Sequence, residues 1–259
     1  MSNDVGTSLA ELVWPEERYA RATNLDLGTR APEEVPDYKF TPKALRLLEE
    51  VLESSQDKYR DRAWSVIGPY GAGKSMFALF LLQLFTDASS LWFRQCFAQL
   101  EHISPGMAQR LRAEVLTPEG QYIPIVVQGA RMAPDLAFCQ ALVKSTTHPS
   151  TDASWASEDF LARLHCALQE FETGVTDSPR LMKLYEEAAN LAKVRGYRGL
   201  LVIVDEFGKF LEQAAWQGDL PDLVIVQYLA ELATGLQDPQ ILFFVLLHQA
   251  MVQTKIRRR

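Results

Sequence analysis

The chain has 259 residues, of which 47% are hydrophobic and 23% are charged, and its formal net charge at pH 7 is −7. This composition is typical of a globular α/β domain with one large core. The acidic balance argues against a dedicated nucleic-acid-binding surface. No apolar run reaches membrane-spanning length, and the first residues do not resemble a signal peptide. We therefore expect a cytoplasmic domain that makes no membrane contact.

The cysteine and histidine residues show no metal or disulfide pattern. The three cysteines, Cys96, Cys139 and Cys166, include no C-x-x-C pair, and the four histidines have no metal-binding spacing. Such cysteines are typical of core residues in a reducing compartment. His165 and Cys166 lie beside an apolar helical stripe, and we expect both to pack in the core.

The N-terminal segment, residues 1–40, is predicted to be irregular because several prolines interrupt it. A helix should begin after it, with Thr41 as N-cap and Pro42 in the first helical position. We assign residues 41–259 to a single α/β core.

A glycine-rich loop follows the first predicted strand. The apolar run 63–67 predicts a buried strand and the run 76–82 predicts a core-facing helix, with GPYGAGKS between them. This stretch fits G-x-x-x-x-G-K-[ST], the phosphate-binding P-loop, in the strand–loop–helix context that the motif requires. The candidate nucleotide-binding residues are Gly68, Pro69, Tyr70, Gly71, Ala72, Gly73, Lys74, Ser75 and Met76.

The chemistry of the loop follows from its residue types. Glycines let successive backbone N–H groups point into one anion-sized hollow, and the helix that begins there adds the positive end of its dipole. Lys74 supplies a positive charge for the β- and γ-phosphates, and the Ser75 hydroxyl is placed to bind Mg²⁺. The alternative is a glycine-rich turn with an exposed lysine, which the flanking strand and helix disfavour.

The central part of the chain is longer than a minimal core requires. Residues 91–97 and 122–127 are strand candidates, and the second is favoured because Gln128-Gly129 follows it. A helix is expected at 133–144 and a polar loop at 145–154. Leucines at helical spacing predict another helix at 161–171. We expect residues 131–197 to form an inserted helical segment.

The last helix of this segment should begin with Ser178 as N-cap and Pro179 in the first helical position. It should stop at Gly196.

A second candidate site follows the continuous apolar run 200–204, which predicts a strand buried on both faces. The run ends in Asp205-Glu206, the form of a Walker B motif. At the carboxyl end of the strand, Asp205 would hold Mg²⁺ and Glu206 would act as general base toward water. The alternative is a solvated acidic turn after a core strand.

A third apolar run, 240–247, predicts another strand, which ends in His248-Gln249. From the residues alone, His248 ends the strand and caps the turn that follows it; a role in the catalytic site is the alternative that the resemblance described below implies.

The stretches GPYGAGKS, LLVIVDEFGKF and ILFFVLLHQ resemble the additional-strand P-loop ATPases, the superclass that includes AAA+ proteins and STAND switches. The resemblance implies an α/β three-layer sandwich with a mainly parallel sheet. It also implies that the strand ending at His248 lies between the other two, with His248 or Gln249 acting as a polar sensor near the γ-phosphate. Tyr38 or Phe40 would lie over the adenine, unless these aromatics only pack a helix onto the sheet.

A narrower likeness rests on DEFGKFLE and LHQ, which are similar to large ATP-binding proteins of prokaryotic phage-defence and DNA-processing systems. It implies that the partners are other subunits of such a system or further copies of the chain. Nucleic acid would then be contacted only indirectly, and the basic residues at 255–259 are expected to be a solvated end.

The family pattern also includes a further strand beside the P-loop strand and a helical lid, for which residues 250–259 are too few. We expect the last strand to come from additional residues or from a partner, and residues 1–259 alone to be poorly soluble or to associate through their sheet.

The function expected from the sequence is ATP binding and hydrolysis with Mg²⁺. Glu206 is the residue that favours hydrolysis over binding alone. The alternatives are a nucleotide-gated STAND-like switch or scaffold with negligible turnover and, less favoured, a P-loop kinase.

Overall fold

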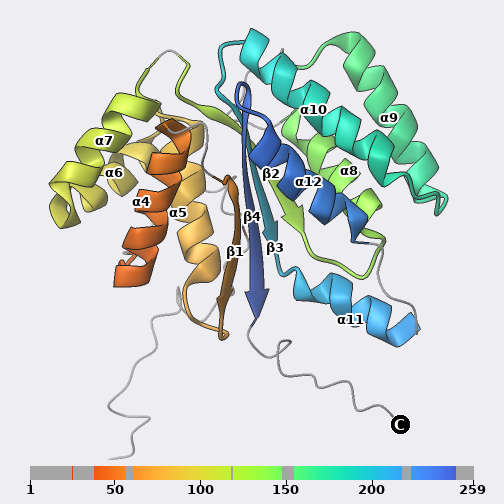
Figure 1. Cartoon of the computed structure of the whole chain (residues 1–259), viewed down its shortest axis with the longest axis horizontal. Coiled ribbons are helices and arrows are strands. Elements are labelled where there is room, and N and C mark those ends of the chain that lie inside the picture. The colour runs from red at the N-terminus through yellow and green to blue at the C-terminus, as the bar shows by residue number, and fades with distance from the viewer. Residues whose placement is uncertain are drawn as a thin grey trace, which may run out of the picture.

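The computed structural model describes residues 25, 38–56, 61–117, 119–147, 155–217 and 223–248. In these residues, four parallel strands form one sheet in the spatial order β1-β4-β3-β2 (Figure 1). The strands are β1 (Ala63–Gly68), β2 (Tyr122–Gln128), β3 (Gly199–Asp205) and β4 (Gln240–His248). All residues of β3 are buried, as expected for a central strand covered on both faces.

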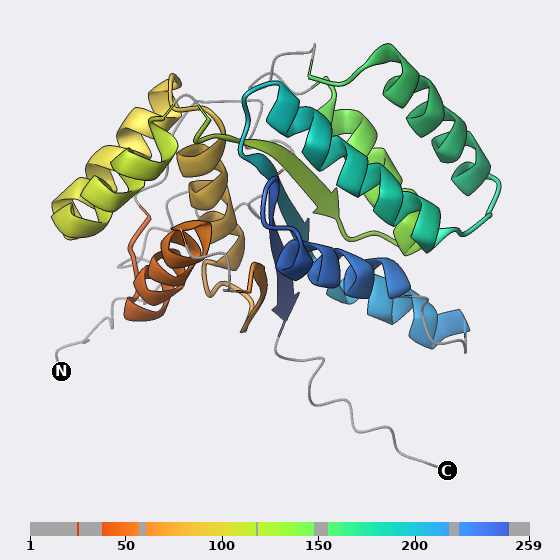
Figure 2. The same cartoon turned by 45° about the horizontal axis from the view of Figure 1, so that its top comes forward.

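Helices cover both faces of the sheet, so the α/β fold has three layers (Figure 2). One layer contains α4 (Pro42–Gln56), α5 (Lys74–Thr86), α6 (Leu91–Ile103) and α7 (Pro105–Val115). The other contains α8 (Pro134–Ser145), α9 (Glu158–Glu172), α10 (Ser178–Val194) and α12 (Val224–Gly235). Helix α11 (Gly208–Gln217) follows the carboxyl end of β3.

Strand β3 shows how the sequence forms two cores. Its side chains alternate, so that Leu200, Val202 and Val204 pack with the α8–α12 layer. Leu201 and Ile203 pack with the α4–α7 layer. This is the two-residue period of a strand with hydrophobic residues on both faces.

The strand register brings the carboxyl ends together. Gly68 lies opposite His248, and Gln128 lies opposite Asp205. The carboxyl ends of the four parallel strands therefore lie at one edge of the sheet, where open α/β sheets bind ligands.

The prediction of a strand at 91–97 is wrong, because this segment belongs to α6. Ser90 caps the helix through its Oγ, which accepts a hydrogen bond from Phe93 N at 2.9 Å. The buried side chains Phe93, Cys96, Phe97 and Leu100 follow the 3.6-residue period. Helical amphipathicity therefore outweighs the strand propensity of Trp92 and Phe93. The strand predicted at 122–127 is confirmed as β2.

The predicted start of α4 is confirmed, since Thr41 Oγ1 accepts from Ala44 N at 3.2 Å. The prediction that Ser178 is an N-cap is wrong by one residue. Asp177 caps α10 by accepting from Arg180 N at 3.0 Å. Ser178 instead donates its hydroxyl proton to Asp135 Oδ1 at 2.7 Å. The helix ends before Gly196, which has φ +85°, as expected for a C-terminal glycine.

The cysteine prediction is confirmed for Cys96 and Cys139, which are buried, and burial raises the pKa of each thiol to about 12. It is wrong for Cys166, which is exposed and donates to Glu170 Oε1 at 3.3 Å. His165 is also exposed. Both residues lie beside the buried stripe of α9, which contains Leu164 and Ala167, rather than in it.

The segment 131–197 holds α8, α9 and α10. Leu181, Tyr185 and Ala188 of α10 lie in the same core as β3. Its interpretation as an insertion, and the boundary at residue 40, stay predictions. The expectations for residues 1–37, for the loop after residue 147, for Gln249 and for the basic residues 255–259 fall outside the described residues, apart from Leu25, which is buried.

Within the described ranges, no single helix has the length and apolar character needed to cross a membrane. Helices α5 and α6 meet such a criterion only as a pair, with a 110° bend between them.

Candidate functional site

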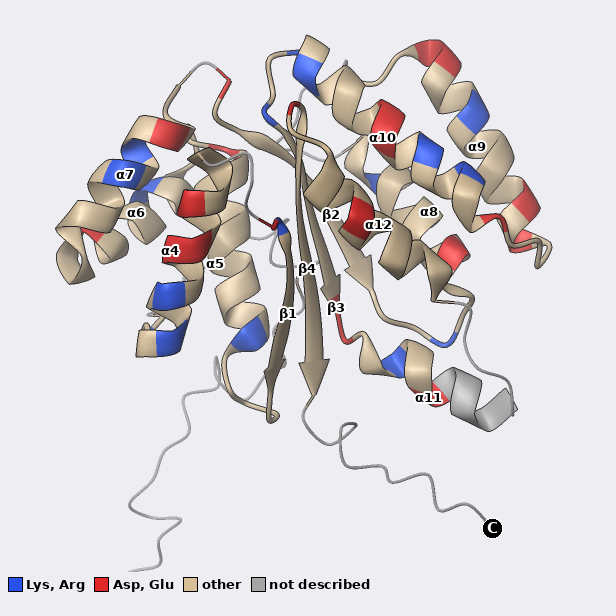
Figure 3. Ribbon diagram, viewed as in Figure 1, with Lys and Arg blue, Asp and Glu red and all other residues tan. Residues whose placement is uncertain are grey.

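The glycine-rich loop joins the end of β1 to the start of α5. Gly71 and Gly73 have φ +74° and +79°, the left-handed region that glycine adopts without strain. The N-cap of α5 is Gly73, which has no side chain that could accept a hydrogen bond from the first turn of this helix. Figure 3 shows a basic residue at the start of α5 and acidic residues after β3. The loop therefore has the geometry of an anion cradle.

Lys74 is folded back onto its own loop. Its Nζ donates to Gly68 O at 2.9 Å and to Pro69 O at 2.8 Å, and it lies 3.3 Å from His248 Nδ1. These contacts account for the three protons of an ammonium group. Burial lowers the pKa of Lys74, and the Asp205 carboxylate opposes this shift.

Ser75 and Asp205 are in direct contact although they are 130 residues apart in sequence. Ser75 Oγ donates to Asp205 Oδ1 at 3.2 Å, and the same oxygen accepts from Glu206 N at 2.9 Å. Asp205 is only 3% exposed. Burial raises the pKa of its carboxyl group, and the two hydrogen bonds act in the opposite direction. A hydroxyl oxygen beside a carboxylate fits the hard oxygen ligands that Mg²⁺ prefers.

Glu206 lies at a sharp change of chain direction. Its φ of +51° is the left-handed conformation that a non-glycine residue rarely adopts. Its Oε2 accepts from Gln128 Nε2 at 3.3 Å and forms an ion pair with Lys209. Residues held in such backbone conformations are often found at functional sites, where the surrounding structure maintains them.

Gly129 makes the close approach between β2 and this turn possible. Its N–H donates to Asp205 O at 2.8 Å. A Cβ atom on Gly129 would lie 2.1 Å from Glu206 O, so no larger residue fits without a shift of the backbone.

His248 lies at the end of β4, which is placed between β1 and β3. Its ring stacks on Tyr70, with centroids 3.6 Å apart and an interplanar angle of 18°. Burial, followed by the Lys74 charge, lowers the pKa of His248. A neutral imidazole accepts at Nδ1 from Lys74, which fixes the other nitrogen, Nε2, as the protonated one.

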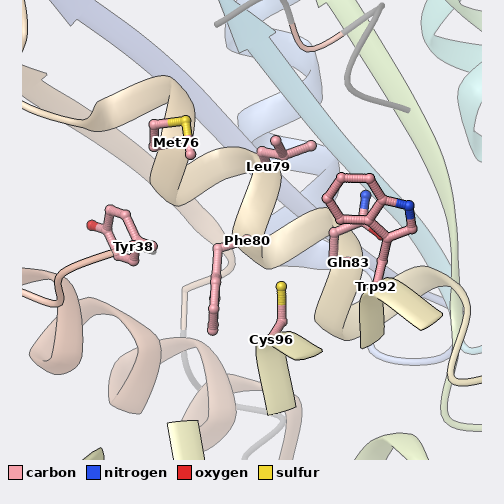
Figure 4. Close-up of a pocket in the computed structure, with 7 residues that line it drawn as sticks. All are labelled: Tyr38, Met76, Leu79, Phe80, Gln83, Trp92 and Cys96. Carbon is pink, nitrogen blue, oxygen red and sulfur yellow. The ribbon is translucent and has the colours of Figure 1, made fainter. Parts of the chain in front are cut away.

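A pocket lies beside the loop, along one side of α5 (Figure 4). Tyr38 Cε2 lies 3.6 Å from the position of a Cβ atom on Gly73, so this ring adjoins the loop. Burial raises the pKa of Tyr38 to about 12. Phe40 packs edge-on against Phe80, with centroids 4.7 Å apart, and Tyr38 packs on the same ring at 5.8 Å. The pocket is lined by Tyr38, Met76, Leu79, Phe80, Gln83, Trp92 and Cys96.

The structure thus brings Lys74, Ser75, Asp205, Glu206 and His248 to one edge of the sheet. Sequence reasoning assigned no role to Gln128 or Lys209. The i, i+3 spacing of Glu206 and Lys209 could have indicated their ion pair. The position of Gln128 depends on the pairing of β2 with β3, for which the sequence gives no direct signal.

Within the described residues, no group of three or more His, Cys, Asp and Glu side chains is arranged to hold a metal ion. A Mg²⁺ ion bound mainly by phosphate oxygens and water needs only one or two protein ligands. No family model matches the chain, and neither the curated proteins nor the solved structures contain a significant match.

Proposed function

We propose that this chain is a P-loop ATPase module that binds ATP with Mg²⁺ at residues 68–76 and hydrolyses it. The observation that carries the proposal is the 3.2 Å hydrogen bond between Ser75 and Asp205. It joins the serine of the phosphate loop to the carboxylate that follows a buried strand. If each motif had arisen by chance, there would be no reason for the two to lie in contact.

The phosphates would be held by the loop N–H groups, the start of α5 and Lys74. Lys74 would exchange its contacts with Gly68 O and Pro69 O for contacts with the β- and γ-phosphates. Ser75 and Asp205 would hold Mg²⁺, which supplies charge neutralisation at the phosphates.

Glu206 is the proposed general base, because it follows the magnesium-binding Asp205 at the same edge of the sheet. His248 would lie near the γ-phosphate, since it contacts Lys74 at 3.3 Å. The strand order supports assignment to the additional-strand class, because β4 lies between β1 and β3 as that resemblance implies.

The base of ATP would lie beside Tyr38, where the pocket must widen to admit it, because its volume of about 10 Å³ is that of a single water molecule. Tyr38 adjoins Gly73, and Met76 lines the same pocket in the first turn of α5. An aromatic and a thioether side chain suit the flat apolar face of a nucleobase. Tyr38 and Phe40 both pack on Phe80 of α5, and Tyr38 is the candidate because its ring also adjoins the loop.

The module would power or gate a multi-component prokaryotic defence or DNA-processing complex. This part of the proposal rests on the DEFGKFLE and LHQ stretches. Partners would be other subunits or further copies of the chain.

A second candidate is a nucleotide-gated switch with negligible turnover. The ion pair between Lys209 and Glu206 favours it, because the pair occupies Oε2, one of the two oxygens that could accept a proton from water.

The binding test compares the parent chain with Lys74→Ala, using a fluorescent ATP analogue with and without Mg²⁺. Loss of a charge-assisted contact should weaken binding by about 1.5–3 kcal/mol, which is roughly 10- to 100-fold in Kd. Lys183→Ala, an exposed lysine of α10, is the control. Equal affinities of Lys74→Ala and the parent would contradict the proposal.

A turnover measurement on the same protein distinguishes an enzyme from a switch. Glu206→Gln keeps the size of the side chain but cannot accept a proton. It should lower turnover by about 10²–10⁴-fold while ATP stays bound. If the parent turns over no faster than the variant, the switch is the better description.

A further inference from the structure

Lys209 contacts the proposed general base in two ways. Its backbone N–H donates to Glu206 O at 2.9 Å, and its ammonium group forms an ion pair with Glu206 Oε2. Gln128 Nε2 donates to the same oxygen at 3.3 Å. Within the described residues, Glu206 Oε1 has no hydrogen-bond partner, so the contacts are concentrated on one oxygen of the carboxylate.

The backbone of Glu206 is held independently of these side-chain contacts. Its N–H donates to Asp205 Oδ1, and Gly129 packs against its carbonyl group. The remaining freedom lies in the side-chain torsions. Gln128 restricts them weakly, since its bond is long and its own Oε1 is buried without a partner among the described residues.

We propose that Lys209 is a positioning residue, which fixes Oε2 of Glu206 so that Oε1 is free to accept a proton from the attacking water. The inference rests on the proposed ATPase function. In the step concerned, water gives one proton to Oε1 and its oxygen bonds to the γ-phosphorus. The bond from that phosphorus to the β–γ bridging oxygen breaks, and its electron pair leaves with ADP.

Lys209 could act on Glu206 through its charge or by fixing the orientation of the side chain. Lys209 is 47% exposed and Glu206 is 35% exposed, so their charge interaction is screened by solvent. Misplacement of a reacting group by about 1 Å can cost up to about 10²-fold in rate. Orientation is therefore the larger effect, and loss of Lys209 should slow turnover.

The test uses Lys209→Met, which keeps the length and removes the charge, and Lys209→Arg, which keeps a cationic donor. Each is made in the full chain, in the parent and in Glu206→Gln, with Lys183→Met as the surface control. We expect Lys209→Met to lower kcat by about tenfold with KM for ATP unchanged. Lys209→Arg should retain most of the activity.

In the Glu206→Gln background, Lys209→Met should cause no further loss, because Lys209 acts through Glu206. An unchanged or raised kcat in Lys209→Met would overturn the inference, as would an equal loss in both backgrounds.

Binding of the fluorescent analogue is measured on every variant. If binding depends on Lys74 and turnover depends on Glu206 while Lys209→Met has no effect, the inference alone fails. If binding is independent of Lys74, the proposed function fails. If the parent binds but turns over no faster than Glu206→Gln, both the catalytic assignment and the inference fail.

Discussion

Lys74 must leave three acceptors before it can reach a phosphate. Two are carbonyl oxygens of its own loop and the third is Nδ1 of His248. In the structure, the loop carbonyls therefore bind the ammonium group that we propose to bind the phosphates. Nucleotide binding would free His248 from this contact and place it beside a strongly negative group.

The protonation of His248 should consequently change on binding. In the free protein, burial and Lys74 lower the pKa of His248, and the Asp205 and Glu206 charges only partly oppose this. A bound triphosphate favours the charged imidazole and should raise the pKa. ATP binding should then take up a proton near and below the ordinary histidine pKa of about 6.5. Affinity should rise as pH falls through that range.

Calorimetry in buffers of different ionisation enthalpy measures this uptake. His248→Gln is the control, because it separates the histidine from the titration of ATP itself. The linkage is limited to about a tenfold gain in affinity per pH unit. Identical pH profiles for the parent and His248→Gln would show that the histidine does not take part.

At the scale of single residues, the sequence identifies site residues that are close neighbours in the chain. Lys74 and Ser75 are specified by one continuous motif, and Asp205 and Glu206 follow one apolar run. Both motifs were assigned to the same Mg²⁺ ion, so they were expected to meet. Only the folded structure shows that Ser75 and Asp205 are in contact. The partners of Glu206 could not be identified in the same way, because Gln128 reaches it only through the pairing of β2 with β3.

Among the elements, the junction after β2 leaves no room for a side chain at Gly129. Gly129→Ala would place a Cβ atom 2.1 Å from Glu206 O and 2.7 Å from Glu206 C, both of them backbone atoms. The turn must shift, and overpacking of this kind destabilises by about 1–3 kcal/mol. Because the turn carries Glu206, turnover should fall together with the melting temperature.

Gly106→Ala in α7 is the matched control, since a Cβ atom there meets no atom within 4 Å. It should leave the melting temperature unchanged or slightly higher, because alanine restricts the unfolded chain. Thermal unfolding followed by circular dichroism compares the two variants. Equal melting temperatures would mean that the turn adapts without strain.

The elements also show why some sequence predictions failed. Residues 91–97 are rich in aromatic residues, which favour a strand, but the buried positions of α6 recur at helical spacing beyond Phe97. The cap of α10 was misplaced because Asp177 and Ser178 are both good N-cap residues. The contact of Ser178 with Asp135 of α8 is tertiary, so it could not be anticipated.

In the whole molecule, β1 is an edge of the described sheet. It pairs with β4 and with no other described strand, and Ile67 on it is 53% exposed. An open strand edge with an exposed apolar side chain favours pairing with another chain. We expect the chain to self-associate through this edge.

Ser65→Lys places a charge at an exposed position of β1, and edge lysines oppose strand pairing. It should lower the mass measured by light scattering and leave ATP binding intact. Gln169→Lys on α9 makes the same change in charge away from the sheet edge. A parent chain that is monomeric at all concentrations would contradict the prediction, as would equal masses for the two variants.

Because β1 pairs with β4, the sheet around the phosphate loop can form only late in the synthesis of the chain. The phosphate loop is made early, but β4 is made last among the described strands, and Lys74 and His248 are 174 residues apart. At the usual pace of translation, roughly 10–35 s separate the two residues. Until residues 240–248 leave the ribosome, the loop lacks the strand that supports it. Under the proposed function, nucleotide would therefore stabilise the chain only after β4 has been made and has paired with β1.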